Sequence, residues 1–166
     1  LLFTTSLSAQ VAIGKATVSS PAVSLEFYDN ADNTRGIILP WVTSTAAVTG
    51  AVNGTLVYNT ADRKVYVKYA SGWRDLSVDN TGTVTTTLQD SLTDQDTAKV
   101  LIGGDPATDT TPGILVLADT NKAMVLPKVA SPHLNIVNPS PGMIVYDTTK
   151  KQLAVFNGTV WSFWKP

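Results

Sequence analysis

The sequence of 166 residues contains no cysteine and a single histidine. The absence of cysteine excludes disulfide bonds, thiolate metal ligands and thiol nucleophiles. The fold must therefore be held by burial of apolar side chains, by pairing of β-strands, or by association with other chains.

Charge is also scarce, because charged residues make up only 15% of the chain. Twelve basic residues face 13 acidic ones, which gives a net charge of −1. This balance offers no basic surface for nucleic acid and no polybasic patch for a membrane. No apolar run reaches the roughly 18–20 residues of a transmembrane segment, so none is expected.

Motifs for catalysis and cofactor binding are missing as well. The sequence has no Gly-x-Ser-x-Gly elbow, phosphate-binding loop or His-Glu-x-x-His motif. His133 has no matched partner, and the aspartates around 79–96 lack the glycine and glutamate of a calcium-binding EF-hand loop. We therefore expect no enzyme activity, no catalytic residue, no cofactor and no metal site, and we interpret the aspartates as a solvated linker.

The chain is rich in threonine, as in Thr83-Val84-Thr85-Thr86-Thr87, and contains four segments that occur twice. β-Branched residues favour strands, and the second occurrence follows the first by about 88 residues each time. The matched segments are 11–15 and 100–104, 36–40 and 123–127, 54–60 and 142–148, and 64–67 and 152–155. The sequence thus predicts two copies of one module, copy 1 at 11–77 and copy 2 at 100–166. They are joined by 78–99, either a linker or extended spacer strands.

Each copy alternates apolar runs with turn residues, which predicts a small β-meander of hairpins closed by a tryptophan strand. In copy 1 the expected strands are 11–14, 56–58 and 64–69. Their counterparts in copy 2 are 100–103, 144–146 and 152–156. The only candidate helical turn is 43–48. The predicted fold class is all-β, a tandem duplication with little or no helix.

The aromatic residues separate into two groups. Tyr58 and Tyr146 are equivalent in the two copies, as are Trp73 and Trp161, so we expect these four in the core. Trp41, Tyr66 and Trp164 have no aromatic counterpart and are the candidate interaction surface. One use of such a surface is glycan binding, because flat aromatic rings also bind sugars.

The first ten residues resemble the end of a signal peptide, with a plausible cleavage point between Ala9 and Gln10. The alternative is a retained N-terminal strand that docks on another subunit, in which case Thr4 and Leu7 are candidate contacts. A leader peptide predicts a secreted protein.

These motifs together resemble a known class of repeat protein. An Ile-Gly opening, a Leu-Pro pair, Gly54-Thr55-Leu56-Val57-Tyr58-Asn59-Thr60 and a closing tryptophan are similar to secreted tail-fibre-like repeat proteins of Bacteroidota. The Arg-Met-Thr that often follows Leu-Pro in that class is absent here. The resemblance implies a structural subunit of a surface fibre, filament or outer-membrane-associated assembly of a Gram-negative bacterium. A carbohydrate-binding adhesin and an accessory component of a secretion or gliding machine remain alternatives.

The same resemblance implies candidate O-glycosylation sites, because the Bacteroidota acceptor sequence is Asp followed by Ser or Thr and then an apolar residue or Thr. Four residues fit it: Ser91, Thr97, Thr110 and Thr148.

Each copy has fewer than 70 residues, and domains of this size are only marginally stable alone because they bury little surface. We therefore expect a homo-oligomer, or a larger protein assembly, that forms through open strand edges.

Overall fold

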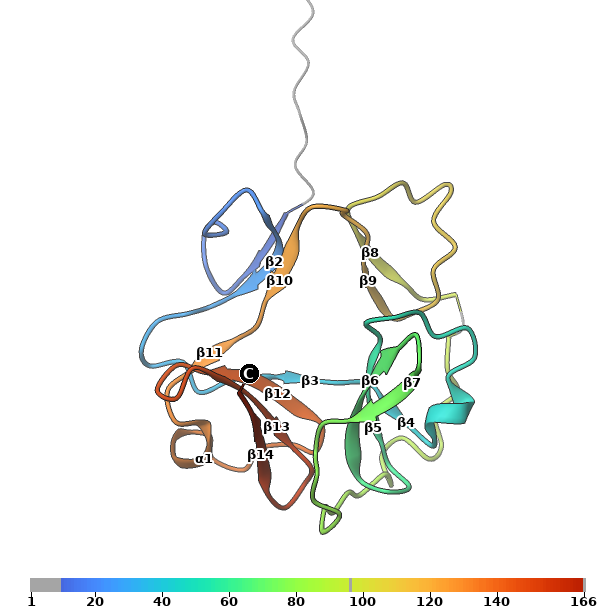
Figure 1. Cartoon of the computed structure of the whole chain (residues 1–166). Coiled ribbons are helices and arrows are strands. Elements are labelled where there is room, and N and C mark those ends of the chain that lie inside the picture. The colour runs from blue at the N-terminus through green and yellow to red at the C-terminus, as the bar shows by residue number, and fades with distance from the viewer. Residues whose placement is uncertain (1–9, 96, 166) are drawn as a thin grey trace, which may run out of the picture.

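The computed structural model describes residues 10–95 and 97–165, and in this part of the chain the fold is all-β (Figure 1). The only helical elements within the described residues are two short turns, the 3₁₀ turn η1 (Thr45–Ala47) and the helix α1 (Pro132–Asn135). The predicted fold class is confirmed. The helical turn predicted in copy 1 is confirmed too, with Ser44 as its N-cap, whereas α1 was not predicted.

Strands of copy 1 begin with a parallel pair and end with an antiparallel meander. They are β1 (Val11–Ile13), β2 (Val23–Phe27), β3 (Ile37–Ile38), β4 (Trp41–Val42), β5 (Leu56–Asn59), β6 (Lys64–Tyr69) and β7 (Gly72–Asp75).

Copy 2 repeats this order of elements. Its strands are β8 (Val100–Ile102), β9 (Leu115–Leu117), β10 (Ala123–Val125), β11 (Lys128–Val129), β12 (Met143–Asp147), β13 (Gln152–Phe156) and β14 (Trp161–Trp164). The predicted bounds 64–69 and 152–156 match β6 and β13. Strands β2 and β9 were not predicted as separate elements.

The turns repeat along with the strands. Arg63 and Lys151 occupy equivalent positions between the paired strands of each meander, with φ of 62° and 55°. In front of each turn a side chain, Asn59 or Asp147, accepts a hydrogen bond from a backbone amide two residues later. Such Asx turns set the hairpin geometry by local hydrogen bonds, so the hairpins could be placed from sequence.

Two segments leave their own copy and pair with the other one. The five-stranded sheet of copy 2 contains β3, which lies antiparallel to β12. In return, β10 joins β1 and β2 as the third strand of a parallel sheet. The two copies are therefore interleaved, and Figure 1 shows β3 crossing from the β12–β14 sheet towards β4.

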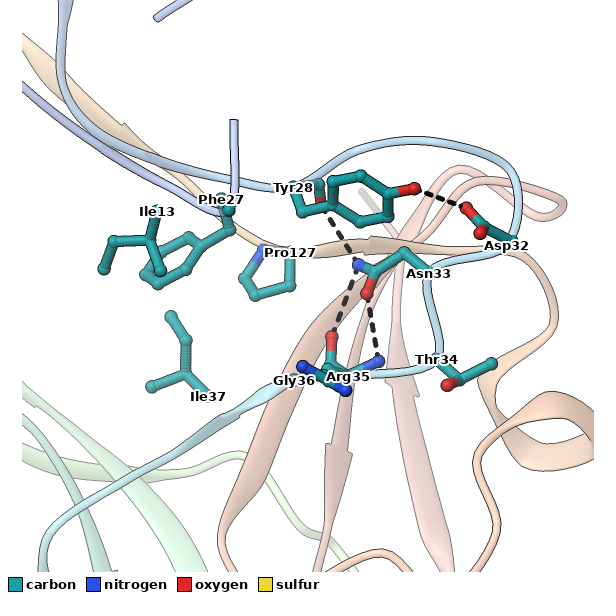
Figure 2. A pocket seen from close by; sticks show the side chains of 11 residues that line it. Ile13, Phe27, Tyr28, Asp32, Asn33, Thr34, Arg35, Gly36, Ile37 and Pro127 are labelled. Atoms are coloured by element: carbon teal, nitrogen blue, oxygen red, sulfur yellow. Dashed lines mark hydrogen bonds between the residues drawn. The ribbon is translucent and has the colours of Figure 1, made fainter. Parts of the chain in front are cut away.

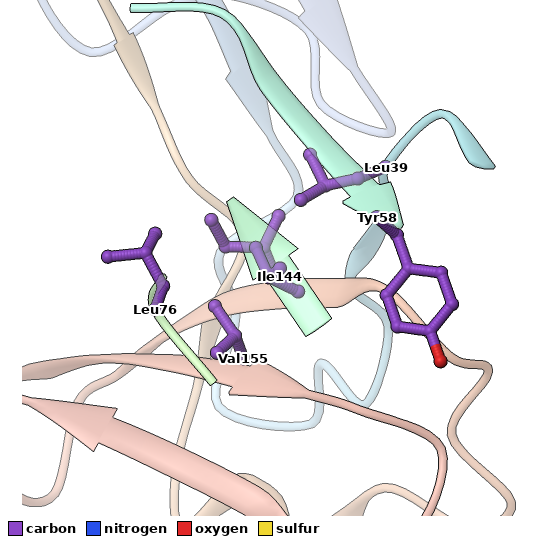
Figure 3. Packing of buried hydrophobic residues seen from close by; sticks show 6 residues of the cluster. Leu39, Tyr58, Leu76, Ile144 and Val155 are labelled. Atoms are coloured by element: carbon purple, nitrogen blue, oxygen red, sulfur yellow. The ribbon is translucent and has the colours of Figure 1, made fainter. Parts of the chain in front are cut away.

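The main hydrophobic core lies between the two meanders and is built by both (Figure 3). Leu39, Tyr58, Val65 and Leu76 of copy 1 pack there against Ile144 and Val155 of copy 2. Tyr58 and Val65 are fully buried. A second cluster lies within copy 2, on the opposite face of β12, around Val145, Ala154 and Phe156.

The first part of the segment between the copies, up to Val84, packs on copy 2, whereas most of 85–95 and all of 97–99 is exposed. Its hydroxyls bond to the last turn of copy 2: Thr83 Oγ1 donates to Gly158 O at 3.0 Å, and Thr159 Oγ1 donates to Thr81 O at 3.0 Å. Val84 contacts the main core. No strand forms in 78–95 or 97–99, and the assignment of this segment as a linker stays a prediction.

Candidate self-association surface

The contact between copies begins where β3 crosses β12. Ile37 pairs with Ile144 and Ile38 with Met143, and the amide of Leu39 donates to the carbonyl of Gly142 at 3.0 Å. A Cβ atom on Gly36 would lie 2.6 Å from Val145 Cγ1 and 2.7 Å from Met143 Cγ. Only glycine lets the chain pass this close to β12.

Two aromatic residues of copy 1 extend this contact. The Tyr58 hydroxyl donates to the carbonyl of Asn157 at 2.7 Å, and the Trp41 indole donates to the carbonyl of Pro141 at 2.9 Å. Burial raises the pKa of Tyr58 to about 12, so the hydroxyl remains a donor over the physiological pH range. Gly142, at φ 80°, lies against the Tyr58 ring. These side chains fix the position of copy 1 on copy 2.

The positions equivalent to this contact, on the side of each copy that faces away from the other copy, are open. Gly54 has φ 91° like Gly142, but a Cβ atom there would have no neighbour within 4 Å. On β5, only Tyr58 and Asn59 pair with β4, and within residues 10–95 and 97–165 no strand pairs with the outer edge at Leu56.

Tyr146, the counterpart of Tyr58, is 36% exposed. Its predicted core position is therefore wrong, because no segment of the described residues buries its ring as copy 2 buries that of Tyr58. Tyr58 is confirmed as a core residue, whereas Trp73 and Trp161 are half-buried.

The parallel sheets of the two copies also differ in whether a third strand covers their outer edge. Copy 1 has a sheet of three strands, β1-β2-β10, but its counterpart in copy 2 has only β8 and β9. Apolar side chains are exposed around this two-stranded sheet, with Val100 57%, Ile114 65% and Leu115 47% exposed. In the described chain, no third strand covers the free edge of β9.

A buried charge stabilises the parallel sheet of copy 1. The Glu26 carboxylate is inaccessible and lies 3.1 Å from Lys15 Nζ, and it accepts the Ser19 amide at 2.6 Å. Burial alone would raise the pKa of Glu26, but the Ser19 amide and the Lys15 ammonium bring it below the usual value of 4.5. In the two parallel pairs, Glu26 is opposite Ala12 and Val116 is opposite Leu101, so Val116 is the counterpart of Glu26.

A cavity of about 610 Å³ lies beside this sheet (Figure 2). Its walls are apolar at Ile13, Phe27, Ile37 and Pro127. Its polar lining includes Asp32, Asn33, Thr34 and Arg35. The Asn33 amide donates to the carbonyls of Tyr28 and Lys128, and the Asp32 carboxylate accepts from the Tyr28 hydroxyl, so both groups are engaged within the chain.

The three predicted interaction aromatics make contacts within the chain. Trp41 bonds to copy 2 as described, and the Trp164 indole donates to the carbonyl of Leu76 in copy 1. The Tyr66 hydroxyl donates to Asp62 Oδ2 at 2.6 Å. Burial raises the pKa of the Tyr66 hydroxyl, and the hydrogen bond to Asp62 and its charge raise it further. Trp41 and Trp164 thus join the copies to one another, and their role towards other molecules stays a prediction. Thr4 and Leu7 lie outside the described residues.

The candidate O-glycosylation residues Ser91, Thr97, Thr110 and Thr148 are all exposed. Their modification stays a prediction. His133 is exposed and its ring lies nearly perpendicular to that of Phe163, with ring centroids 5.7 Å apart. Among the residues that the structure describes, no three His, Asp or Glu side chains are grouped as metal ligands, and no helix is long and apolar enough to cross a membrane.

Residues 105–165, most of copy 2, match a protein family described as "phage tail like trimerisation region". The match fits a tail-fibre-like protein in general. No curated protein and no solved structure matches the chain.

The edge contacts and open edges could not be found from the sequence alone, although the repeat of Gly54 as Gly142 and of Tyr58 as Tyr146 marks the residues involved.

Proposed function

We propose that this chain is a non-enzymatic structural subunit that associates with two further copies of itself in a fibre-like assembly. The observation that carries the proposal is that, among residues 10–95 and 97–165, no strand pairs with the outer edge of β5 at Leu56 or with the free edge of β9, although each edge has a paired counterpart in the other copy. Open edges of this kind favour association with another chain. The family match in copy 2 supports three as the number of subunits.

A secreted or surface location on a Gram-negative bacterium belongs to the proposal. It is supported by the leader-like first ten residues and by the resemblance to secreted repeat proteins. Glycan binding is less favoured, because the indole groups of Trp41 and Trp164 are already engaged within the chain.

The test is the mass of the protein in solution, measured by size-exclusion chromatography with light scattering and by native mass spectrometry. One chain has a mass of 17.6 kDa. We expect a single species of three times that mass over a wide concentration range. A monomer at all concentrations would contradict the proposed function.

A further inference from the structure

We propose that the subunits join head to tail, with copy 2 of one subunit docking on copy 1 of the next through a repeat of the contact between copies within the chain. This inference rests on the proposed self-association and specifies its interface. In it, residues 124–126 of one subunit cover the free edge of β5 in the next, and β3 of that next subunit covers the free edge of β9.

The edge of β5 is the first part of this interface. Within the chain, Ile37, Ile38 and Leu39 run antiparallel along Ile144, Met143 and Gly142. The repeat makes Met124, Val125 and Leu126 the counterparts of the first three residues, and Leu56, Thr55 and Gly54 the counterparts of the second three. The described chain fulfils the first set of pairings, whereas Leu56, Thr55 and Gly54 have no strand on their outer edge.

The burial of the two edges agrees with this difference. Gly142, Met143 and Ile144 are buried under β3. Their counterparts are more accessible, since Gly54 is exposed and Thr55 and Leu56 are only half-buried. The same strand sequence therefore has its edge covered in one copy and open in the other.

The edge of β9 is the second part. Within the chain, β10 of copy 2 pairs in parallel with β2 of copy 1. The counterpart of this pairing is β3 of one subunit beside β9 of another, and in the described chain β9 pairs only with β8. Ile38 of β3 is 50% exposed and Leu115 of β9 is 47% exposed. Pairing of the two strands would bury apolar surface on both.

One neighbouring subunit supplies both missing strands. Within the chain, the upstream copy gives β3 to the downstream copy and receives β10 from it. Between two subunits, copy 2 of one takes the upstream role and copy 1 of the next takes the downstream role. The same exchange then places residues 124–126 of the first subunit beside β5 of the next, and β3 of the next beside β9 of the first. β3 and β10 keep their present partners, because each uses its second edge.

Side chains fit this exchange as well. Tyr58 packs on Gly142 and donates to the carbonyl of Asn157, so its counterpart Tyr146 would pack on Gly54 of the next subunit and donate to the carbonyl of Tyr69. Tyr146, Gly54 and Tyr69 are all exposed in the single chain. Trp41 is replaced by Lys128 in copy 2, so its bond to Pro141 has no counterpart.

The proposed contact is heterologous, because the two surfaces that meet are different. Heterologous contacts that close give rings, and those that do not close give filaments. A ring of three subunits would place six modules in sequence around the axis, with contacts between copies alternating within and between chains. This arrangement accounts for a duplicated module in a trimer.

Because the sequence contains no cysteine, a disulfide bond can be introduced at chosen positions to test the interface. Ile38 and Met143 form a pair next to the hydrogen-bonded pair Leu39–Gly142, so their Cα atoms should be about 4.5 Å apart, which allows a disulfide. The counterpart pair across the proposed interface is Val125 and Thr55. We therefore compare Thr55→Cys/Val125→Cys with the internal control Ile38→Cys/Met143→Cys, both oxidised and run on non-reducing gels.

The expected result is that most Thr55→Cys/Val125→Cys chains run as covalent dimers and trimers, whereas the control retains the mass of one chain. A mixture of the two single variants Thr55→Cys and Val125→Cys should give disulfide-linked dimers, and neither single variant alone should do so. If the protein is trimeric by light scattering but the Thr55/Val125 pair does not cross-link while the control pair does, this interface is overturned and the proposed function stands. A monomeric protein would instead contradict the proposed function itself.

Tyr146→Arg provides a second measurement, because the exposed side chain should allow the chain to fold. We expect the circular dichroism spectrum to be unchanged and the dissociation constant of the trimer to rise at least tenfold. The matched control is Val137→Arg, at a residue that is 82% exposed and outside the proposed interface. An equal effect of the two substitutions would also overturn the interface.

Discussion

The strands β5 and β12 carry nearly the same sequence but have different surroundings. β12 is covered on both faces by the two hydrophobic clusters and on its outer edge by β3 and β11. Among the described residues, the outer edge of β5, opposite the edge that pairs with β6, is covered only at Tyr58 and Asn59, where β4 lies. The difference comes from the contact between the copies, because β3 lies along β12 whereas no strand of the described residues lies along the equivalent part of β5. A repeated sequence can thus encode the same contact twice, although the single chain forms it only once.

The largest expected effect separates the two equivalent tyrosines. Tyr58→Ala removes a fully buried ring and the hydroxyl that bonds to Asn157, and should lower the free energy of unfolding by about 4 kcal/mol. Tyr146→Ala should leave the fold of the single chain intact and weaken only its association. Urea unfolding followed by circular dichroism, with light scattering on the same samples, measures both. Equal losses of folded structure in the two variants would remove the distinction between the copies.

A smaller effect is expected where β3 crosses β12. Gly36→Ala places a Cβ atom within 2.6–2.7 Å of the Val145 and Met143 side chains and should lower the free energy of unfolding by about 2 kcal/mol. The counterpart of Gly36 is Ala123, which is exposed, so the control Ala123→Gly should cost less than about 1 kcal/mol. Thermal unfolding of both variants at one protein concentration tests this. If Gly36→Ala left the free energy of unfolding unchanged, β3 would not be closely packed against β12.

The smallest expected effect compares the parallel sheets, of which only the one in copy 1 buries a carboxylate. Glu26→Gln should lower the free energy of unfolding by about 1.5 kcal/mol at pH 7, since it weakens the bonds to Lys15 and the Ser19 amide. Because folding lowers the pKa of Glu26, this stabilisation is complete above about pH 4.5 and is lost as the pH falls through the folded value.

The difference in unfolding free energy between wild type and Glu26→Gln should therefore shrink between pH 5 and pH 2, as measured by urea unfolding at each pH. The matched control is Val116→Thr in copy 2, which should show no such dependence on pH. A constant difference between wild type and Glu26→Gln would contradict the assignment.

The hairpins could be predicted from the sequence because the signals that specify them are local. Asn59 and Asp147 form the turns, and the alternating residues of β6 and β13 form the strands that follow. The parallel strands β2 and β9 were missed, because pairing between strands that are not joined by a tight turn leaves no local pattern.

The candidate interface could be predicted only in part. Trp41 was singled out because it has no aromatic counterpart, but nothing in the sequence indicated that its indole bonds to the carbonyl of Pro141, 100 residues away in the chain. Tyr146 was assigned to the core because it repeats Tyr58, an inference that holds only if both copies have the same neighbours. Sequence equivalence identifies the residues of a contact, whereas the number of times the contact forms depends on the tertiary structure.

The crossing of β3 onto β12 also has a consequence for the order of folding. Copy 1 leaves the ribosome first, but Tyr58 finds its hydrogen-bond acceptor 99 residues later, at Asn157. Until copy 2 has been synthesised, Leu39 and Tyr58 lack Ile144 and Val155, their partners from copy 2 in the main core. Contacts between residues so far apart in the chain slow folding, because a large loop must close before they form. The nascent first copy is therefore expected to be aggregation-prone and to depend on chaperones until the second copy is complete.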